Sequence, residues 1–291
     1  MSLTIHWTDH LTGIMRRAAD PPRLLVACDF DGTLAPIVPT PAEAALLPGM
    51  EEVLRSLSTA PGVHLAFVSG RPLEDLKKRV PIAAAGFIGS HGLEMQGHVL
   101  DGVPGAAAAW RGRFPFIADA IRRRTEQLPG VFVKEKPLSV AVHYRHACSA
   151  DAAAVQALLQ DTVNGAREFR LQEGHMVTEL LPAIGRDKGT ALCALADRLG
   201  VPRSAVICCG DDLTDETMFT GLPNALSIHI GPGPTAAACR ADSPADLLQL
   251  LQHVDAARRK TCGKDPAEVK VRLAAARPAL SPHCKGAQRC G

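Results

Sequence analysis

The stretch LLVACDFDGTLAP, residues 24–36, places two carboxylates, Asp29 and Asp31, at the end of an apolar run and just before Gly32. A short apolar run of this kind is typical of a buried strand. Removing one carboxylate from water is costly, and a second one beside it adds repulsion between like charges. The pair therefore needs a cation or a shared proton, and the stretch predicts a strand whose end carries a metal site, a reaction, or both.

The same pattern recurs twice further along the chain. Apolar segments at 63–71 (VHLAFVSGR) and 86–92 (GFIGSHG) also run into small polar residues and glycine, and segments with helical spacing separate the three. Strands that alternate with helices favour parallel pairing, in which functional side chains collect at the carboxyl ends of the strands. Asp29, Ser69 and Ser90 all fall at such ends. We therefore predict an α/β fold with a Rossmann-like parallel-sheet core.

The pattern changes between residues 106 and 181, where a helix, two strands, a helix and two further strands follow one another. This order predicts an antiparallel sheet with helices on one side, inserted into the first domain as a separate α/β domain. Strands and helices then alternate again. We predict a core formed by residues 1–105 and 182–255, an inserted domain over 106–181, and a basic, weakly ordered C-terminal tail over 256–291.

Composition and charge narrow the class of protein. The 291 residues are 46% hydrophobic and 21% charged, as in globular chains, and the net charge is +2. The tail holds nine Lys or Arg and two Asp or Glu, a net of +7, which leaves −5 for the other 255 residues. No apolar run approaches the roughly 18 residues of a membrane span, and no basic start precedes an apolar block. We expect a cytoplasmic monomer with a small-molecule partner, and neither nucleic acid nor a membrane.

Four groups of polar residues follow strands or begin helices in the α/β part of the chain. They are Asp29 with Asp31, Ser69-Gly70-Arg71, Lys188 at a helix start, and GDDLTDE at 210–216. Hard carboxylate oxygens suit Mg²⁺, which proteins usually bind through one or two carboxylates together with substrate phosphate oxygens. A lysine and a hydroxyl suit the peripheral oxygens of a phosphate. The combination predicts a site for Mg²⁺ and a phosphate ester.

In order and spacing, these groups resemble the motifs of the haloacid dehalogenase superfamily of phosphatases: DFDGT (29–33), then Ser69, then Lys188, then GDD (210–212). The resemblance implies that Asp29 attacks phosphorus to form an aspartyl-phosphate, while Asp31 protonates the leaving alcohol and then activates water. One acid is then an ionised nucleophile and its neighbour a proton donor, and Mg²⁺ neutralises the excess charge. The catalytic residues implied are Asp29, Asp31, Ser69 and Lys188, and the metal residues are Asp29, Asp31, Asp211 and Asp215.

The resemblance narrows with five segments: SHGLE (90–94), LSVAVHYR (138–145), GHMVTELLP (174–182), KGTAL (188–192) and GDDLTDE (210–216). Together they are similar to the trehalose-6-phosphate phosphatase family over roughly residues 22–255. This implies that the inserted domain is a cap, which closes over the core and grips the sugar with Lys136 and Glu179. Members often carry a glutamate two residues before this lysine, where the chain has Lys134. The candidate substrate-binding residues are Gly70, Arg71, His91, Lys136, His143, Arg145 and Glu179.

Strand periodicity supports a polar face on the predicted cap. Alternation in LSVAVHYR places Ser139, Ala141, His143 and Arg145 on one face, opposite the larger apolar side chains. Glu179 lies on a single face of its own strand by the same rule. A sugar needs convergent polar groups above an otherwise apolar floor, so this arrangement suits a sugar-binding cleft.

Three functions remain open at this point. The first is Mg²⁺-dependent hydrolysis of trehalose 6-phosphate, and the second is hydrolysis of another sugar phosphate, such as sucrose phosphate or a mannosyl phosphoglycerate. The third is a catalytically silent protein that senses a sugar phosphate by domain closure. The intact set of Asp29, Asp31, Lys188 and Asp211 argues against the third, because a sensor needs neither a nucleophile nor a proton donor.

Overall fold

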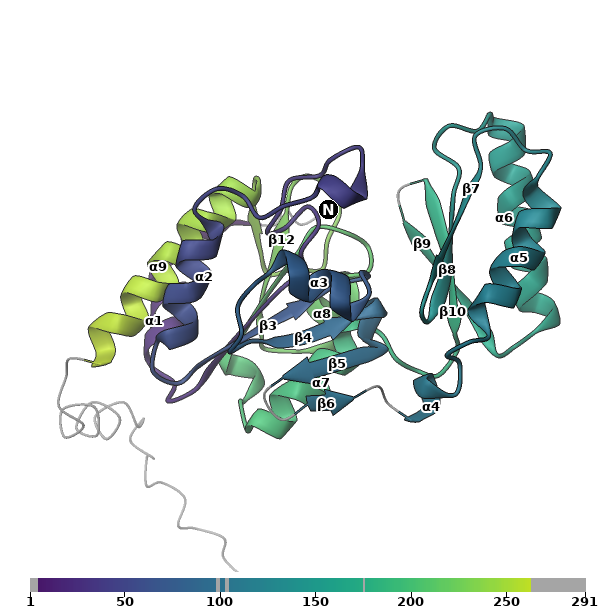
Figure 1. Cartoon of the computed structure of the whole chain (residues 1–291). Coiled ribbons are helices and arrows are strands. Elements are labelled where there is room, and N and C mark those ends of the chain that lie inside the picture. The colour runs from purple at the N-terminus through teal and green to yellow at the C-terminus, as the bar shows by residue number, and fades with distance from the viewer. Residues whose placement is uncertain (1–4, 98–99, 103–104, 175, 263–291) are drawn as a thin grey trace, which may run out of the picture.

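The computed structural model describes residues 5–97, 100–102, 105–174 and 176–262. Within this part of the chain, nine strands form the larger sheet, in the spatial order β1-β13-β12-β11-β2-β3-β4-β5-β6 (Figure 1). The strands are β1 (Ile5–His6), β2 (Leu24–Cys28), β3 (Val63–Val68), β4 (Gly86–Gly89), β5 (Glu94–Gly97), β6 (Leu100–Gly102), β11 (Val206–Gly210), β12 (Leu226–Ile230) and β13 (Cys239–Ala241). Neighbouring strands from β1 to β4 in this order are parallel, which confirms the predicted parallel-sheet core.

Helices cover both faces of this sheet, which explains why β2 is buried along its whole length. Leu24 and Val26 pack on the face covered by α1 (Leu11–Ala19), α2 (Met50–Thr59), α3 (Leu73–Arg79) and α9 (Pro244–Cys262). Leu25 and Ala27 pack on the opposite face, against α7 (Lys188–Leu199) and α8 (Glu216–Gly221). Short 3₁₀ helices join some of these elements: η1 (Trp7–His10), η2 (Pro41–Glu43), η3 (Ser90–Gly92) and η4 (Arg203–Ala205).

The strand register brings the predicted site residues to one edge. Cys28 at the end of β2 pairs with Cys209 of β11 and with Phe67 of β3, and Val68 pairs with Ile88 of β4. The residues that follow these strands therefore emerge side by side at the carboxyl edge of the sheet, as parallel pairing predicts.

The core sheet has edges that the sequence analysis did not predict. β5 pairs antiparallel with β4, and β6 pairs antiparallel with β5, while β1 adds a two-residue parallel strand at the other edge. These strands are short, and β5 and β6 are rich in polar residues and glycine, so they lack the apolar run by which the central strands are recognised.

The smaller sheet contains four antiparallel strands within the described residues, in the order β7-β8-β10-β9. They are β7 (Phe132–Lys136), β8 (Ser139–His143), β9 (Phe169–Gly174) and β10 (Val177–Pro182), and the helices of this segment are α4 (Gly105–Ala108), α5 (Phe114–Thr125) and α6 (Ser149–Gly165). Figure 1 shows α5 and α6 on the outer side of this sheet, away from the core. A separate antiparallel sheet with helices on one side was the fold predicted for the inserted segment, and it is confirmed. We call it the cap sheet.

The predicted C-terminal tail overlaps the last helix. α9 continues through Cys262, so residues 256–262 are helical, and Arg258 within them is buried. The remainder of that tail, residues 263–291, lies outside the described residues. No helix in the described part of the chain is both long and apolar enough to span a bilayer.

Candidate active site

The centre of the site is a buried lysine that joins two carboxylates. Lys188 Nζ donates hydrogen bonds to Asp29 Oδ1 and to Asp215 Oδ1, each at 2.8 Å. All three side chains are almost fully buried. Burial alone lowers the pKa of Lys188, but Asp215 and Asp29 outweigh burial and raise it above its usual value. Lys188 is therefore a permanent ammonium at the end of β2.

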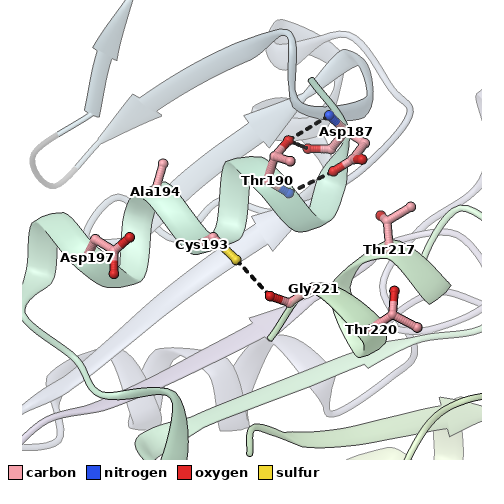
Figure 2. A pocket seen from close by; sticks show the side chains of 8 residues that line it. All are labelled: Asp187, Thr190, Cys193, Ala194, Asp197, Thr217, Thr220 and Gly221. Carbon is pink, nitrogen blue, oxygen red and sulfur yellow. Dashed lines mark hydrogen bonds between the residues drawn. The ribbon is translucent and has the colours of Figure 1, made fainter. Parts of the chain in front are cut away.

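The start of α7 places this lysine. Asp187 and Thr190 form a capping box, in which Asp187 Oδ1 accepts a hydrogen bond from Thr190 N at 2.7 Å and Thr190 Oγ1 accepts one from Asp187 N at 2.9 Å (Figure 2). Gly189 follows, and a Cβ there would lie 2.0 Å from the carbonyl oxygen of Thr217. Only glycine lets α7 approach α8 so closely, and this approach brings Lys188 to Asp215.

The loop after β11 adds a third carboxylate, Asp211. The backbone N–H groups of Asp211 and Asp212 donate to Asp215 Oδ2, each at 3.1 Å, so Asp215 holds this loop in shape. Thr33 Oγ1 donates to Asp211 Oδ1 at 3.1 Å. A Cβ on Gly32 would lie only 2.0 Å from Asp211 Oδ2. Glycine in the DFDGT motif therefore leaves the space that Asp211 occupies.

The acid cluster carries more negative charge than Lys188 can balance. Asp29, Asp211 and Asp215 each offer an oxygen within 4.8 Å of the others, against one ammonium. Burial and the neighbouring acids raise the pKa of Asp29 well above its usual value, although Lys188 opposes this, and burial and Asp215 raise the pKa of Asp211 to about 7. Such a set of hard oxygens with excess negative charge fits a divalent cation of the Mg²⁺ type.

Asp31 does not join this cluster. Its carboxylate accepts two hydrogen bonds from Arg71, from Nε and Nη2, each at 2.6 Å. Arg71 also donates to Asp75 Oδ2 at 2.7 Å and to the carbonyl oxygen of Pro41 at 2.8 Å, and it lies over the ring of Phe30. The guanidinium that was predicted to bind substrate makes these hydrogen bonds to Asp31, Asp75 and the loop at Pro41.

The turn after β4 is shaped by unusual backbone angles. Ser90 and His91 have φ of 49° and 55°, the left-handed region that few residues other than glycine adopt. His91 N donates to the carbonyl oxygen of Ser69, and Ser90 Oγ donates to Glu94 Oε2. A Cβ on Gly70 would lie 2.5 Å from the His91 ring. Strained backbone of this kind is typical of functional sites. Here the left-handed turn directs the His91 ring across Gly70 toward the cap sheet.

The cap sheet meets the core at Glu179. Its Oε2 accepts hydrogen bonds from Lys136 Nζ at 2.7 Å and from His91 Nε2 at 3.3 Å, and its Oε1 accepts one from Ser139 Oγ. Lys136 Nζ also donates to the carbonyl oxygen of Gly70 at 3.2 Å. Burial raises the pKa of Glu179, but Lys136 and His91 outweigh burial and hold it well below its usual value. Glu179 is therefore a buried carboxylate that joins cap and core.

Two of the surface cavities that the described residues line lie on the core. One, of about 480 Å³, lies between α7 and α8 and is lined by Asp187, Thr190, Cys193, Ala194, Asp197, Thr217, Thr220 and Gly221 (Figure 2). None of these is a predicted site residue. The other, of about 350 Å³, borders the acid cluster through Gly32 and Asp211. The second cavity thus gives open space next to the predicted metal position.

Comparison with known proteins identifies the family. The family model described as trehalose-phosphatase matches residues 27–244. The chain belongs to the trehalose-phosphatase family.

Relatives in this family are similar along most of the chain. The trehalose-phosphate phosphatase of Mycobacterium leprae (strain TN) is 34% identical over 270 residues, which cover 86% of this chain and 60% of that protein. That of Mycobacterium tuberculosis (strain ATCC 25618 / H37Rv) is 37% identical over 238 residues, 78% of this chain and 60% of the other. The chain thus spans about 60% of the length of these curated relatives. The C-terminal domain of the C. albicans trehalose-6-phosphate phosphatase shares the fold, with a TM-score of 0.75 at 22% identity over 87% of this chain and 98% of that one.

Within this trehalose-phosphatase fold, the predicted site residues form two groups. Asp29, Lys188, Asp211 and Asp215 meet in the acid cluster, and Gly70, His91, Lys136 and Glu179 meet where cap and core touch. Ser69 is buried, and its Oγ accepts a hydrogen bond from Arg71 N at 3.2 Å. His143 lies on the cap face that contains Glu179, two residues along the strand from Ala141, the register partner of Glu179. Arg145 is exposed beyond the end of β8 and has no hydrogen bond or ion pair within the described residues.

Some residues that shape this candidate site were not predicted from the sequence. Thr33 orients Asp211, Asp75 orients Arg71, and Asp187 caps the helix that bears Lys188. Asp75 stands four residues after Arg71 in a helical segment, and Asp187 directly precedes Lys188. Helical spacing and capping rules would have found both of these, whereas Thr33 contacts a residue far away in the sequence.

Proposed function

We propose that this chain hydrolyses trehalose 6-phosphate to trehalose and phosphate, with Mg²⁺, through an aspartyl-phosphate on Asp29. One observation carries the proposal: Asp29 is a buried carboxylate at a strand end, held on one oxygen by Lys188, within an acid cluster of excess negative charge. Among the described residues no hydrogen-bond donor reaches its other oxygen, Oδ2. That oxygen is free to attack.

Each residue has a distinct task in the proposed mechanism. Asp29 Oδ2 attacks phosphorus, the bond from phosphorus to the sugar oxygen breaks, and Asp31 gives its proton to the departing oxygen. Asp31 then takes a proton from water, the water oxygen attacks phosphorus, and phosphate leaves Asp29. Lys188 places positive charge beside the phosphoryl oxygens throughout. When bound at Asp29 and Asp211, Mg²⁺ would supply further positive charge to the phosphoryl group.

The ion pair with Arg71 sets a condition on the proton donor. A carboxylate that accepts two hydrogen bonds from a guanidinium carries no proton. Asp31 must therefore leave Arg71 and take up a proton before it can protonate the leaving group. The side chain of Asp31 is more than one-third exposed, so solvent can supply that proton.

The cap would supply substrate specificity. Lys136 and Glu179 both bear polar groups at the boundary with the core, where sugar hydroxyls could replace the hydrogen bonds that now join them. Exchange of these hydrogen bonds for bonds to the sugar would couple recognition of the leaving group to closure of the cap.

Phosphate release tests the proposed activity. We would measure it with Mg²⁺ and then with EDTA, on trehalose 6-phosphate, sucrose 6-phosphate, glucose 6-phosphate and mannosyl phosphoglycerate. We expect trehalose 6-phosphate to be preferred, and EDTA to stop turnover. Preference for another ester would retain the chemistry of the core and discard Lys136 and Glu179 as trehalose contacts. No turnover of any ester would favour the sugar-phosphate sensor.

Replacement of the nucleophile gives the sharpest test of the mechanism. Asp29→Asn should lower the rate of phosphate release by about 10⁴-fold or more, because no other group can form the covalent intermediate. Binding of trehalose 6-phosphate, measured by calorimetry, should persist. Asp9→Asn, at an exposed position in η1, is the matched control and should leave the rate unchanged. Substantial turnover by Asp29→Asn would disprove the assignment.

Several expectations stay predictions: the domain limits, a cytoplasmic location, a monomeric state, and the lack of nucleic-acid and membrane partners. Size-exclusion chromatography with light scattering would test the oligomeric state directly.

A further inference from the structure

Phe132 is an exposed aromatic residue on the cap sheet. Its side chain is 63% exposed, and it is the first residue of β7. Its register partner on β8 is His143, and the two ring centroids are 6.2 Å apart with a tilt of 40°. A large apolar side chain left in water at this exposure forfeits the stabilisation that burial would give it.

Strand register places Phe132 on the same face of the cap sheet as Lys136 and Glu179, the residues proposed to bind the sugar. Lys134 pairs with Ala141, which pairs with Glu179, so these residues form one row across the sheet. Phe132 and Lys136 stand two residues on either side of Lys134, and alternation keeps all three on one face. This is the face that touches the core through Lys136 and Glu179.

The spacing suits a second sugar ring. Two residues along a strand cover about 7 Å, so the Phe132 row lies about that far from the Glu179 row. Two linked sugar rings are offset by a similar length. If Glu179 and Lys136 hold one ring of the disaccharide, the second ring therefore lies either over Phe132 or over the other end of the strands, on the side of Lys136. The opposite end meets the core, where Lys136 Nζ reaches the carbonyl oxygen of Gly70.

We propose that Phe132, with His143 beside it, forms a stacking platform for the glucose ring of the substrate that carries no phosphate. This inference rests on the proposed function, and it adds a subsite for the distal ring. One face of a glucose ring consists of C–H groups, which pack on the face of an aromatic ring, while its rim hydroxyls bond to polar neighbours. His143 supplies a polar neighbour at this position, and Lys134 supplies another.

Phe116, a second exposed phenylalanine, shows how a role in sugar binding can be distinguished from the general effect of removing an exposed aromatic ring. Phe116 is 77% exposed, and it lies on α5, the helix that covers the outer side of the cap sheet (Figure 1). Because α5 lies on the side of the cap sheet away from the core, Phe116 is exposed where no substrate bound between cap and core would reach it. Phe116→Ala is therefore the matched control for Phe132→Ala. Both substitutions remove an exposed ring, and neither should unfold the domain.

The test compares ligands with and without the distal ring. For Phe132→Ala we expect KM for trehalose 6-phosphate and the inhibition constant of trehalose to rise by about 3- to 10-fold. The inhibition constant of glucose 6-phosphate, which lacks that ring, should not change. Phe132→Tyr should restore wild-type values, and Phe116→Ala should match wild type for all three ligands.

The outcomes distinguish the platform from the proposed function. If wild type releases no phosphate from trehalose 6-phosphate, the proposed function fails. If it does, an unchanged KM in Phe132→Ala overturns the platform. An equal loss for glucose 6-phosphate also overturns it, because the ring would then act in cap closure rather than in recognition of the distal ring. A spectroscopic check is the Phe132→Trp variant, whose added fluorescence should shift on addition of trehalose and not of glucose.

Discussion

At the scale of single residues, charge balance dominates the site. Asp29, Asp211 and Asp215 surround one ammonium, and burial disfavours every charge among them. A pKa of about 7 for Asp211 follows from this crowding, because a buried carboxyl group beside another carboxylate stays protonated to a higher pH. The acid cluster is therefore poised to exchange protons for a metal ion near neutral pH.

This crowding predicts a pH-dependent affinity for Mg²⁺. The metal binds the deprotonated cluster, and Asp211, with a pKa of about 7, is mostly protonated at pH 6 and mostly ionised at pH 8. The dissociation constant for Mg²⁺, measured by calorimetry without substrate, should therefore fall by about tenfold between pH 6 and pH 8. Asp211→Asn should bind Mg²⁺ weakly at both values. A dissociation constant that is the same at pH 6 and pH 8 would refute the exchange of proton for metal.

How far the site could be predicted also depends on the residue. The motif around Asp29 predicted that this carboxylate lies at the end of a buried strand, because a short apolar run and its polar end are local signals. The ion pair of Asp31 with Arg71 was not predicted, since it joins residues 40 positions apart and depends on the path of the loop between them. The contact of Thr33 with Asp211 could not be predicted for the same reason, since these residues are 178 positions apart in the sequence.

At the scale of elements, the cap sheet combines two faces with different tasks. Val140, Val142 and Leu180 pack toward α5 and α6, while Glu179 and Ser139 lie on the face that meets the core. Alternation along the strands predicted this division, because side chains on a strand point in turn to opposite sides. It did not predict that Glu179 would bond across the boundary to His91, since His91 depends on the left-handed turn after β4.

The contact of Glu179 predicts a pH dependence of stability. Its pKa is depressed in the folded state, so its stabilising effect is complete above its ordinary pKa of about 4.5 and is lost as the pH falls below that value. The difference in free energy of unfolding between wild type and Glu179→Gln should be constant from pH 6 to 8 and should shrink toward pH 3.5. Urea titrations at each pH would measure it. Glu126→Gln, at an exposed position, is the control, and a difference that persists unchanged at pH 3.5 would contradict the depressed pKa.

At the scale of the whole molecule, α9 holds the loops that precede β2 and β3 through hydrogen bonds from one of its side chains. Arg258 near its C-terminal end is buried and donates to the carbonyl oxygens of Pro21 at 2.6 Å, Pro22 at 2.9 Å and Pro61 at 3.0 Å. These carbonyls belong to the loops that lead into β2 and β3, the strands that carry Asp29 and Ser69. A basic residue that the charge pattern assigned to the tail is thus part of the core.

Two truncations test this role. Removal of residues 263–291 should leave the free energy of unfolding and kcat close to those of the full chain. Removal of 256–291 also deletes Arg258, and because several carbonyls then lose a charged donor, it should cost about 3 kcal/mol or more. Urea denaturation of both variants would measure the difference. Equal stability of the two would show that Arg258 does not support the loops before β2 and β3.

The central place of β2 has a consequence for how the molecule opens. This strand is paired on both sides, by β11 and β3, and all five of its residues are buried. Its amide hydrogens should therefore exchange with deuterium only when the entire core unfolds, whereas those of the four-stranded cap sheet can exchange through smaller openings. Under the proposed mechanism, the cap sheet parts from the core in each cycle while the backbone beneath Asp29 keeps its geometry.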